Sequence, residues 1–296
     1  MKKRVLVTGG SGFLGTNLII SLVKQGYKVT SLSKKKKINF FNKKNVEQIN
    51  CDISNLKKLK KKIKSSYDYI FNFSGNINHK DKTETLNAHY LGLKNLLKVI
   101  NKKKLKLFIQ IGSSLEYGRL KSPQREIKNC KPISYYGKAK YLASKEIFKS
   151  KLKKYVILRL YQVYGPNQKR DRLIPFVIGE CLKNKKFNCS DGNQIRDFLY
   201  VEDFIKLVSL ILKKKNISSG VYNIGSNNPV RVKDVIQIIL DNIKKGKPHF
   251  GKTKMRKDEI MELYPDILKT KKEFKWKPET GLKEGLQKTI KSYAQK

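Results

Sequence analysis

The sequence predicts an α/β protein with a doubly wound parallel sheet and a smaller, interleaved C-terminal lobe. Over the first 160 residues, short apolar segments alternate with longer helical patterns, as in a sheet built from strand–helix units. The apolar segments are continuous rather than alternating, which is typical of strands that helices cover on both faces. After Gly165-Pro166 the segments shorten, and this change of rhythm indicates a second lobe.

The first part contains strand candidates of five to seven residues, rich in Val, Ile, Phe and Leu, at 4–8, 28–32, 46–50, 69–73, 105–111 and 155–160. Helical patterns lie between them at 12–25, 56–64, 84–103 and 134–151, and Ser134 is a candidate cap for the last of these. Further along, a strand at 194–201 leads into a helix at 202–214, a strand at 220–224 precedes a helix at 233–244, and a short helix is expected at 281–291. We expect a first domain at 1–164 and a lobe at 165–296, with about 194–214 returning to the first domain.

Composition narrows the class of protein. The chain has 296 residues, of which 39% are apolar, and its apolar runs are too short for a membrane span of ~20 residues. The basic start is not followed by the apolar segment of a secretory signal. The four cysteines form no CxxC pair and have no histidine at ligand spacing, so we expect no metal site and free thiols in a reducing cytoplasm.

The chain is strongly basic, with a formal net charge of +44 from 67 Lys plus Arg against 23 Asp plus Glu. Nearly all the basic residues are lysines, and they are spread along the whole chain, whereas a nucleic-acid binder usually concentrates arginine. We therefore expect no specific nucleic-acid partner. The charge should attract phosphorylated ligands and cause nonspecific binding to polyanions at low salt.

A glycine-rich turn joins the first strand to the first helix. Gly9, Gly12 and Gly15 give the GxxGxxG spacing, and Gly10 also completes GxGxxG. Glycines let the backbone approach a pyrophosphate, and the helix N-terminus then offers unpaired N–H groups. The position between a strand and a helix near the N-terminus makes residues 1–164 a candidate dinucleotide-binding domain of the Rossmann type.

The residues after the second and third strands bear on which dinucleotide binds. NAD-binding proteins often carry an acid at the end of the second strand, but here Ser33 stands there, followed by Lys34. A hydroxyl and an ammonium suit the 2′-phosphate of NADP, so NADP is favoured over NAD. Asp52, after the third strand, is a candidate to reach the adenine amino group or, alternatively, to hold its loop or cap a helix.

Tyr136 and Lys140 place a phenol and an ammonium one helical turn apart. A nearby cation lowers the pKa of tyrosine from about 10, so such a phenol can exchange a proton with an alcohol while hydride moves. The spacing alone is weak evidence, because it also occurs at Tyr90, Tyr117 and Tyr141. Tyr136 is preferred because it begins the helix that follows the fifth strand.

The fifth strand ends in Ser113-Ser114-Leu115-Glu116, and ligands bind beyond the carboxyl ends of parallel strands. Ser114, with Ser113 as the second choice, is a candidate to hold the oxygen of a substrate. The alternative is that the two serines only form a turn. Glu116 is a candidate second acid or base, or a partner within a polar loop.

Several segments together resemble the extended short-chain dehydrogenase/reductase family, in its nucleotide-sugar epimerase/dehydratase branch. They are Thr8 to Gly15, Ser113 to Gly118, Tyr136 to Lys140, Arg159 to Pro166, Gln194 to Val201, Tyr222 to Gly225, Trp276-Lys277-Pro278 and Gly285-Leu286. The resemblance covers nearly the whole chain and implies a nicotinamide cofactor on the first domain and a nucleoside-diphosphate sugar on the second lobe.

The resemblance also implies the residues of the site. The cofactor contacts implied are Gly9, Gly12, Phe13, Leu14, Gly15, Ser33, Lys34, Asp52, Ile53, Ser74 and Lys140. The catalytic residues implied are Ser114, Tyr136 and Lys140, and the substrate contacts are Ser114, Glu116, Gln162, Arg196 and Arg256, the two arginines gripping the diphosphate. Gln162 and His89 stand where the family often has Asn.

Several reactions fit this resemblance. The Ser-Ser-Leu-Glu-Tyr-Gly form is similar to that of some 4-keto-6-deoxy-sugar reductases, so an NAD(P)-dependent 4-keto-sugar reductase is the preferred hypothesis. A 4-epimerase is the alternative, and a 4,6-dehydratase comes third, since the Asp expected beside Ser114 is replaced by Leu115. A nonenzymatic sensor or basic binding module is the alternative of another class. Family members often dimerise, so a cytoplasmic homodimer is expected.

Overall fold

The computed structural model describes residues 2–34, 45–76, 81–127, 129–256 and 258–295. The chain divides into two compact units. The first comprises Met1–Gly118, Glu126–Arg159 and Lys215–Tyr222, and the second comprises Arg119–Arg125, Leu160–Lys214 and Asn223–Lys296. Each is described by itself.

A parallel sheet is the centre of the first unit. Among the described residues, seven strands stand in the order β10-β6-β5-β4-β1-β2-β3. They are β1 (Arg4–Thr8), β2 (Lys28–Ser33), β3 (Val46–Asn50), β4 (Tyr69–Asn72), β5 (Leu107–Ser113), β6 (Tyr155–Leu160) and β10 (Gly220–Ile224). This confirms the predicted fold class. The expected strand at 105–111 lies two residues later, which makes Ser113 the last residue of β5.

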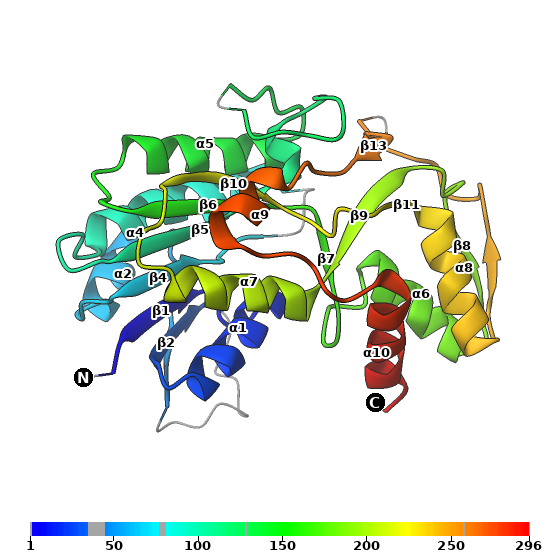
Figure 1. The fold of residues 1–296 in the computed structure, drawn as a ribbon, viewed down its shortest axis with the longest axis horizontal. Coiled ribbons are helices and arrows are strands. Elements are labelled where there is room, and N and C mark those ends of the chain that lie inside the picture. The colour runs from blue at the N-terminus through cyan, green and yellow to red at the C-terminus, as the bar shows by residue number, and fades with distance from the viewer. Residues whose placement is uncertain (1, 35–44, 77–80, 128, 257, 296) are drawn as a thin grey trace. The chain divides into compact units, whose positions relative to one another are not determined.

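Helices cover both faces of this sheet (Figure 1). Helix α1 (Phe13–Lys24) lies on one face, and α2 (Leu56–Lys62), α4 (Gly92–Val99) and α5 (Tyr135–Lys149) lie on the other. The side chains that α2, α4 and α5 turn inward share one hydrophobic core with the strands. This arrangement explains the continuous apolar strands of the sequence.

The helix expected at 84–103 is divided into three parts. Helix α3 (Lys82–Leu86) runs into a π-helical turn, η1 (Asn87–Leu91), and α4 then ends at Val99. Such wide turns are frequent at functional sites, and this one carries His89 into the interior, where only 3% of its surface is exposed.

The second unit is built from short elements. Its strands are β7 (Gln162–Tyr164), β8 (Lys186–Asn188), β9 (Ile195–Tyr200), β11 (Pro229–Arg231), β12 (Lys247–His249) and β13 (Glu262–Leu263), and its helices are α6 (Leu173–Leu182), α7 (Val201–Lys213), α8 (Val232–Ile243), α9 (Leu268–Phe274) and α10 (Leu282–Ala294). Strands β7, β11 and β13 pair with β9, and α6, α8 and α10 enclose a hydrophobic core. Of these elements β9, α7, α8 and α10 were predicted. The other strands have two or three residues and carry no periodic signal, and the helices α6 and α9 were also missed.

The described residues contain neither a membrane-spanning helix nor a cluster of metal ligands. No helix among them is long and apolar enough to cross a membrane. Nor do three or more His, Cys, Asp or Glu side chains gather anywhere in this part of the chain as a metal site would require.

Candidate functional site

The turn between β1 and α1 needs glycine for its own packing at two positions. Gly9 has φ +68°, and an added Cβ would lie 2.5 Å from the Phe73 carbonyl oxygen. A Cβ at Gly15 would lie 2.3 Å from the Gly9 carbonyl oxygen. These glycines let the first turn of α1 close against the backbone of β1 and of the segment after β4.

The third glycine leaves the start of α1 open. Gly12 is the exposed N-terminal cap of this 12-residue helix and gives its first-turn N–H groups no side-chain acceptor. Phe13 and Leu14 follow half-buried in that first turn. The arrangement fits a pyrophosphate, because uncapped N–H groups and the helix dipole favour an anion where a side chain would otherwise stand.

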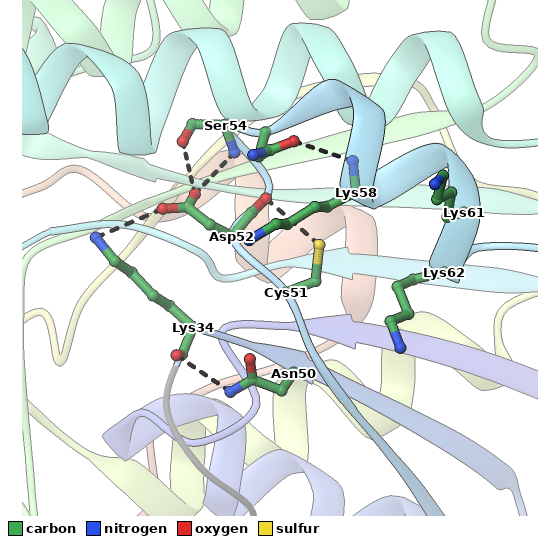
Figure 2. A pocket seen from close by; sticks show the side chains of 9 residues that line it. Lys34, Asn50, Cys51, Asp52, Ser54, Lys58, Lys61 and Lys62 are labelled. Carbon is green, nitrogen blue, oxygen red and sulfur yellow. Dashed lines mark hydrogen bonds and ion pairs between the residues drawn. The ribbon is translucent and has the colours of Figure 1, made fainter.

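Beyond the ends of β2 and β3 lies a cleft of about 640 Å³ that contains Asp52 (Figure 2). The Asp52 carboxylate accepts hydrogen bonds from the Ser54 backbone N–H at 2.9 Å and hydroxyl at 2.7 Å. Lys34 Nζ lies 3.5 Å from Asp52 and 3.4 Å from Glu84. Burial raises the pKa of Asp52, but the Ser54 hydrogen bonds and the Lys34 charge outweigh it, so the net shift is downward. Asp52 is therefore ionised and holds its own loop.

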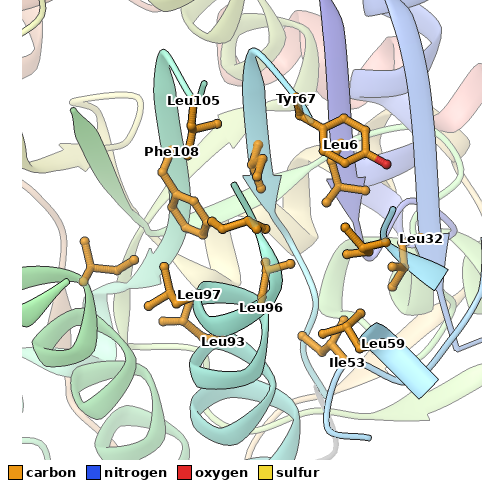
Figure 3. Close-up of a cluster of buried hydrophobic side chains, with 14 of the residues drawn as sticks. Leu6, Leu32, Ile53, Leu59, Tyr67, Leu93, Leu96, Leu97, Leu105 and Phe108 are labelled. Atoms are coloured by element: carbon orange, nitrogen blue, oxygen red, sulfur yellow. The ribbon is translucent and has the colours of Figure 1, made fainter. Parts of the chain in front are cut away.

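The remaining cofactor candidates have different surroundings. The Ile53 side chain belongs to the hydrophobic core near Leu59 and Leu93 (Figure 3), so a cofactor could be contacted only by its main chain. Ser33 and Ser74 are half-buried at the ends of β2 and β4, and Ser74 N–H donates to Thr8 Oγ1 at 3.3 Å. The first unit thus brings all the sequence-predicted cofactor residues to the carboxyl edge of its sheet.

Lys140 stands out among the lysines because it is 4% exposed. Its ammonium donates to the Ile111 carbonyl oxygen at 2.9 Å and lies 5.7 Å from the Tyr136 ring centre. Burial lowers the pKa of Lys140 to about 8, and the charge of Glu116 opposes this shift. A buried cation beside a half-buried phenol is an arrangement suited to proton transfer.

The other three Tyr–Lys pairs lack this arrangement. Tyr117 is 2% exposed, and burial raises the pKa of its phenol. Tyr90 is hydrogen-bonded to Glu146 at 3.4 Å. The partner of Tyr141 is Lys145, an exposed lysine. Geometry therefore favours Tyr136 and Lys140.

A histidine lies against the candidate phenol. The rings of His89 and Tyr136 meet edge to face with their centres 5.0 Å apart. His89 Nε2 lies 2.9 Å from the Asn76 carbonyl oxygen. Since a carbonyl only accepts, Nε2 carries the proton, which fixes the orientation of the imidazole against Tyr136.

The two serines occupy successive positions at the end of β5. Ser113 Oγ accepts from the Leu115 N–H at 3.2 Å, and Ser114 begins the 3₁₀ turn η2 (Ser114–Glu116). Both are buried, at 7% and 3% exposure. Both hydroxyls are therefore candidates to meet a substrate oxygen.

Glu116 is enclosed by protein partners. Its side chain is 0% exposed and forms an ion pair with Arg159, whose Nη2 is 2.9 Å from Glu116 Oε2. This favours the alternative that Glu116 is a partner within a polar loop over the expected contact with substrate.

In the second unit a glutamate joins the two arginines expected to bind a diphosphate. Arg196 Nη2 pairs with Glu259 Oε1, while Arg256 Nε donates to Glu259 Oε2 at 3.1 Å. Arg196 is buried, and it also donates to the Ile195 and Met261 carbonyl oxygens. Gln162 is exposed on β7. The two arginines are thus brought together, as a joint role in binding one anion requires.

Comparison with known proteins identifies the family. Residues 5–225 match the model of the NAD dependent epimerase/dehydratase family. The chain belongs to this family. The match includes the glycine turn, both serines, Tyr136 and Lys140, and it agrees with the resemblance carried by those residues.

Several curated relatives of this family are similar over nearly the whole chain. A protein of Methanocaldococcus jannaschii named "Putative UDP-glucose 4-epimerase" is 31% identical over 97% of this chain and 97% of its own. CDP-abequose synthase of Salmonella muenchen is 27% identical over 98% of both chains. Human dTDP-D-glucose 4,6-dehydratase is 29% identical over 98% of this chain and 90% of its own. These names are enzyme names, and none describes a nonenzymatic sensor.

Solved structures of the family share the fold. UDP-glucuronic acid 4-epimerase from Bacillus cereus, in complex with UDP-glucuronic acid and NAD, has a TM-score of 0.87 and 25% identity, with 99% of each chain covered. WbmG of Bordetella bronchiseptica in complex with NAD has a TM-score of 0.89 and 24% identity, with 100% of this chain and 95% of that chain covered. The family is thus supported by fold as well as by sequence.

The sequence did not lead us to two charged residues, Arg159 and Glu259, which form ion pairs with candidate site residues. Arg159 interrupts the apolar strand β6 and was not proposed for any role beyond the motif it belongs to. Its position in an otherwise apolar strand was a signal, since a buried arginine requires a counterion. Glu259, three residues after Arg256, was the corresponding signal in the second unit.

Proposed function

We propose that this protein catalyses hydride exchange at C4 of a nucleoside-diphosphate sugar, with reduction of a 4-keto sugar as the preferred reaction. The observation that carries the proposal is the buried Lys140 ammonium beside the half-buried Tyr136 phenol, close to the carboxyl end of β5. Two hydroxyls, those of Ser113 and Ser114, end the same strand. Together they provide the proton and the hydrogen bonds that a reacting C4 oxygen needs.

Each residue has a distinct task in this mechanism. The nicotinamide cofactor, when bound, supplies or accepts hydride. Tyr136 gives a proton to the C4 oxygen during reduction, or takes it during oxidation. The Lys140 charge favours the phenolate form of Tyr136 and so eases that transfer. Ser114, or Ser113 in its place, donates a hydrogen bond that orients the oxygen.

For the cofactor we propose NAD first and NADP as the alternative. Lys34 was the residue expected to welcome a 2′-phosphate, but its ammonium is paired with Asp52 and Glu84. A 2′-phosphate would have to compete with both carboxylates. Titration of the protein with NADH and NADPH decides between them, and at least tenfold tighter binding of NADPH would reverse our order.

For the substrate we propose that Arg196 and Arg256 bind the diphosphate, since arginine forms bidentate hydrogen bonds with phosphate oxygens. The two guanidinium groups converge on Glu259 in the second unit, and a diphosphate would displace that carboxylate from them. Replacing Arg256 with Ala should raise the dissociation constant of UDP about tenfold, and replacing it with Lys should recover only part of the loss.

The test of the reaction is turnover with 4-keto sugar nucleotides. The unmodified protein should oxidise one equivalent of reduced cofactor per sugar reduced. Tyr136→Phe should lower kcat at least about 100-fold while cofactor binding remains, because the ring stays and only the hydroxyl is lost. Turnover that survives this substitution would refute the assignment of Tyr136.

A 4-epimerase is the second candidate, favoured by the 31% identity to the protein named "Putative UDP-glucose 4-epimerase". The same residues would serve both reactions, but epimerisation consumes no cofactor overall. Conversion of a UDP-hexose into its C4 epimer without net NADH formation would establish this alternative. A 4,6-dehydratase would instead release water and shift the product mass.

We also propose a cytoplasmic homodimer. Apolar side chains are exposed along α3, η1 and α5 of the first unit, namely Leu86, Leu91, Leu142 and Phe148. Burial of these side chains against a second copy would remove them from water. All four cysteines are free and buried, which suits a reducing compartment. Light scattering after gel filtration should give twice the 34.3 kDa of one chain.

A further inference from the structure

The Glu116 carboxylate connects three elements of the first unit. Its Oε1 accepts from the Ser113 backbone N–H at 2.8 Å, at the end of β5. Its Oε2 accepts from the Ser144 hydroxyl on α5 at 2.7 Å and from Arg159 Nε on β6 at 3.1 Å. The side chains of Glu116 and Arg159 are both 0% exposed.

The guanidinium of Arg159 has further contacts in the interior. Arg159 also donates to the Ile127 carbonyl oxygen at 3.3 Å, and its guanidinium lies 4.3 Å from the centre of the Tyr117 ring. An ion pair buried this completely becomes destabilising once one partner is removed, since the other charge is left without compensation. The carboxylate therefore has one well-defined position.

That position sets the spacing between the serine turn and α5. An added Cβ at Gly112 would lie 2.6 Å from Glu116 Oε1, and one at Gly137 would lie 2.3 Å from the Leu115 carbonyl oxygen. The turn η2 thus packs directly on the first turn of α5, with no room for a side chain between them. Ser144 lies four residues after Lys140, on the same face of the helix.

Glu116 also affects the charge of Lys140. Burial favours the neutral amine, and the Glu116 carboxylate favours the ammonium. Other charged or titratable groups around this part of α5 are Arg159 behind Glu116, Tyr136 on the same helix, His89 on η1 and Lys82 on α3. Among them Glu116 is the acid, so its loss should make protonation of Lys140 harder.

We propose that Glu116 is a positioning residue, which holds the Ser113–Ser114 turn at a defined distance from Tyr136 and Lys140. This role rests on the proposed function. It replaces contact with substrate, because the carboxylate is enclosed by Ser113, Ser144 and Arg159.

Two substitutions at position 116 test separately the charge of the carboxylate and the length of the side chain. Glu116→Gln keeps the shape and loses the charge, whereas Glu116→Asp keeps the charge and loses reach. Both should lower kcat about 100-fold, because small displacements of catalytic groups have effects of that size. The dissociation constants of NAD and UDP should change less than about threefold. The decline of kcat at alkaline pH should begin at a lower pH in Glu116→Gln than in the unmodified protein. It should not shift in Glu116→Asp, since only Glu116→Gln removes the charge facing Lys140.

A compensated variant makes the test independent of the stability of Glu116→Gln. Glu116→Gln with Arg159→Met removes both charges and should melt near the unmodified protein while kcat stays low. Ser144→Ala loses one hydrogen bond and should lower kcat without moving the pH profile. Unchanged kcat and an unchanged pH profile in the compensated variant would overturn the role of Glu116.

The two proposals fail in different ways. An unmodified protein that turns over no nucleotide sugar with either cofactor would overturn the proposed function, and with it this role. Activity in the unmodified protein together with equal activity in the variants would overturn the role of Glu116 alone.

Discussion

An imidazole occupies the space in which Gly75 would carry a side chain. A Cβ on Gly75 would lie 2.1 Å from His89 Cε1 and 2.7 Å from His89 Nδ1. His89 cannot withdraw easily, because Asn76 holds its Nε2 and Tyr136 meets its ring edge. The His89 ring therefore requires glycine at position 75, and His89 in turn packs against the candidate phenol of Tyr136.

Gly75→Ala should accordingly destabilise the fold by about 1–3 kcal/mol, because the added Cβ would displace the buried His89 ring. Equilibrium unfolding in urea measures the change. Gly179→Ala is the matched control, because an added Cβ on Gly179, within α6, meets nothing within 4 Å. That control should stabilise by up to about 1 kcal/mol, as Ala for Gly does within a helix. Equal effects of the two substitutions would contradict the coupling of Gly75 to His89.

The buried ammonium predicts a pH dependence. Burial lowers the pKa of Lys140 to about 8, so its positive charge is present below that pH and is lost above it. Turnover should therefore decline as pH rises beyond about 8, because the phenolate of Tyr136 loses its stabilising cation. The kcat profile between pH 6 and 10 measures this. Lys140→Met should abolish the alkaline limb together with most of the activity, and a limb that persists in this variant would assign it to another group.

Helix α5 owes the geometry of its first turn to a cap. The Ser134 hydroxyl accepts from the Gly137 N–H at 3.0 Å, and Tyr136 lies between these two residues. Gly137 is buried, so this turn cannot shift without disturbing η2. The cap of a helix here controls the position of a candidate catalytic group.

Ser134→Ala should therefore cost about 1 kcal/mol of stability and also lower kcat, since the turn that carries Tyr136 frays. Ser134→Asp retains an acceptor oxygen at the cap and should restore both properties. Urea unfolding and steady-state kinetics on the two variants provide the comparison. If the Asp variant is as impaired as the Ala variant, the hydroxyl acts through some contact other than capping.

The net charge of +44 affects the behaviour of the molecule as a whole. We expect the protein to bind single-stranded DNA nonspecifically at low salt, because lysines release counterions from any polyanion. Affinity should fall at least about 100-fold between 50 and 200 mM salt, and two oligonucleotides of unrelated sequence should bind alike. Fluorescence anisotropy measures both. Binding that discriminates between the sequences would point to a dedicated nucleic-acid site.

Most elements of the first unit follow from short-range pattern. Strands at 4–8, 46–50 and 155–160 were predicted with the bounds observed, because apolar runs between turn residues are a local signal. The π-helical turn at Asn87–Leu91 was not predicted, because it depends on the fit of His89 beside Gly75 and Tyr136. The short strands of the second unit depend on pairing with distant segments, β7, β11 and β13 with β9 and β8 with β12, and were missed for the same reason.

Residue patterns in the chain were enough to indicate the glycine turn, the Tyr136–Lys140 pair and the family, since each depends on neighbours a few residues apart. Whether Glu116 faced a ligand or the interior depended on Arg159, which lies 43 residues away along the chain. Arg196 and Glu259 are 63 residues apart and meet because β9, which contains Arg196, pairs with β13, which follows Glu259. Partners at such separations are set by how the chain returns on itself, and burial then decides which charges must be neutralised.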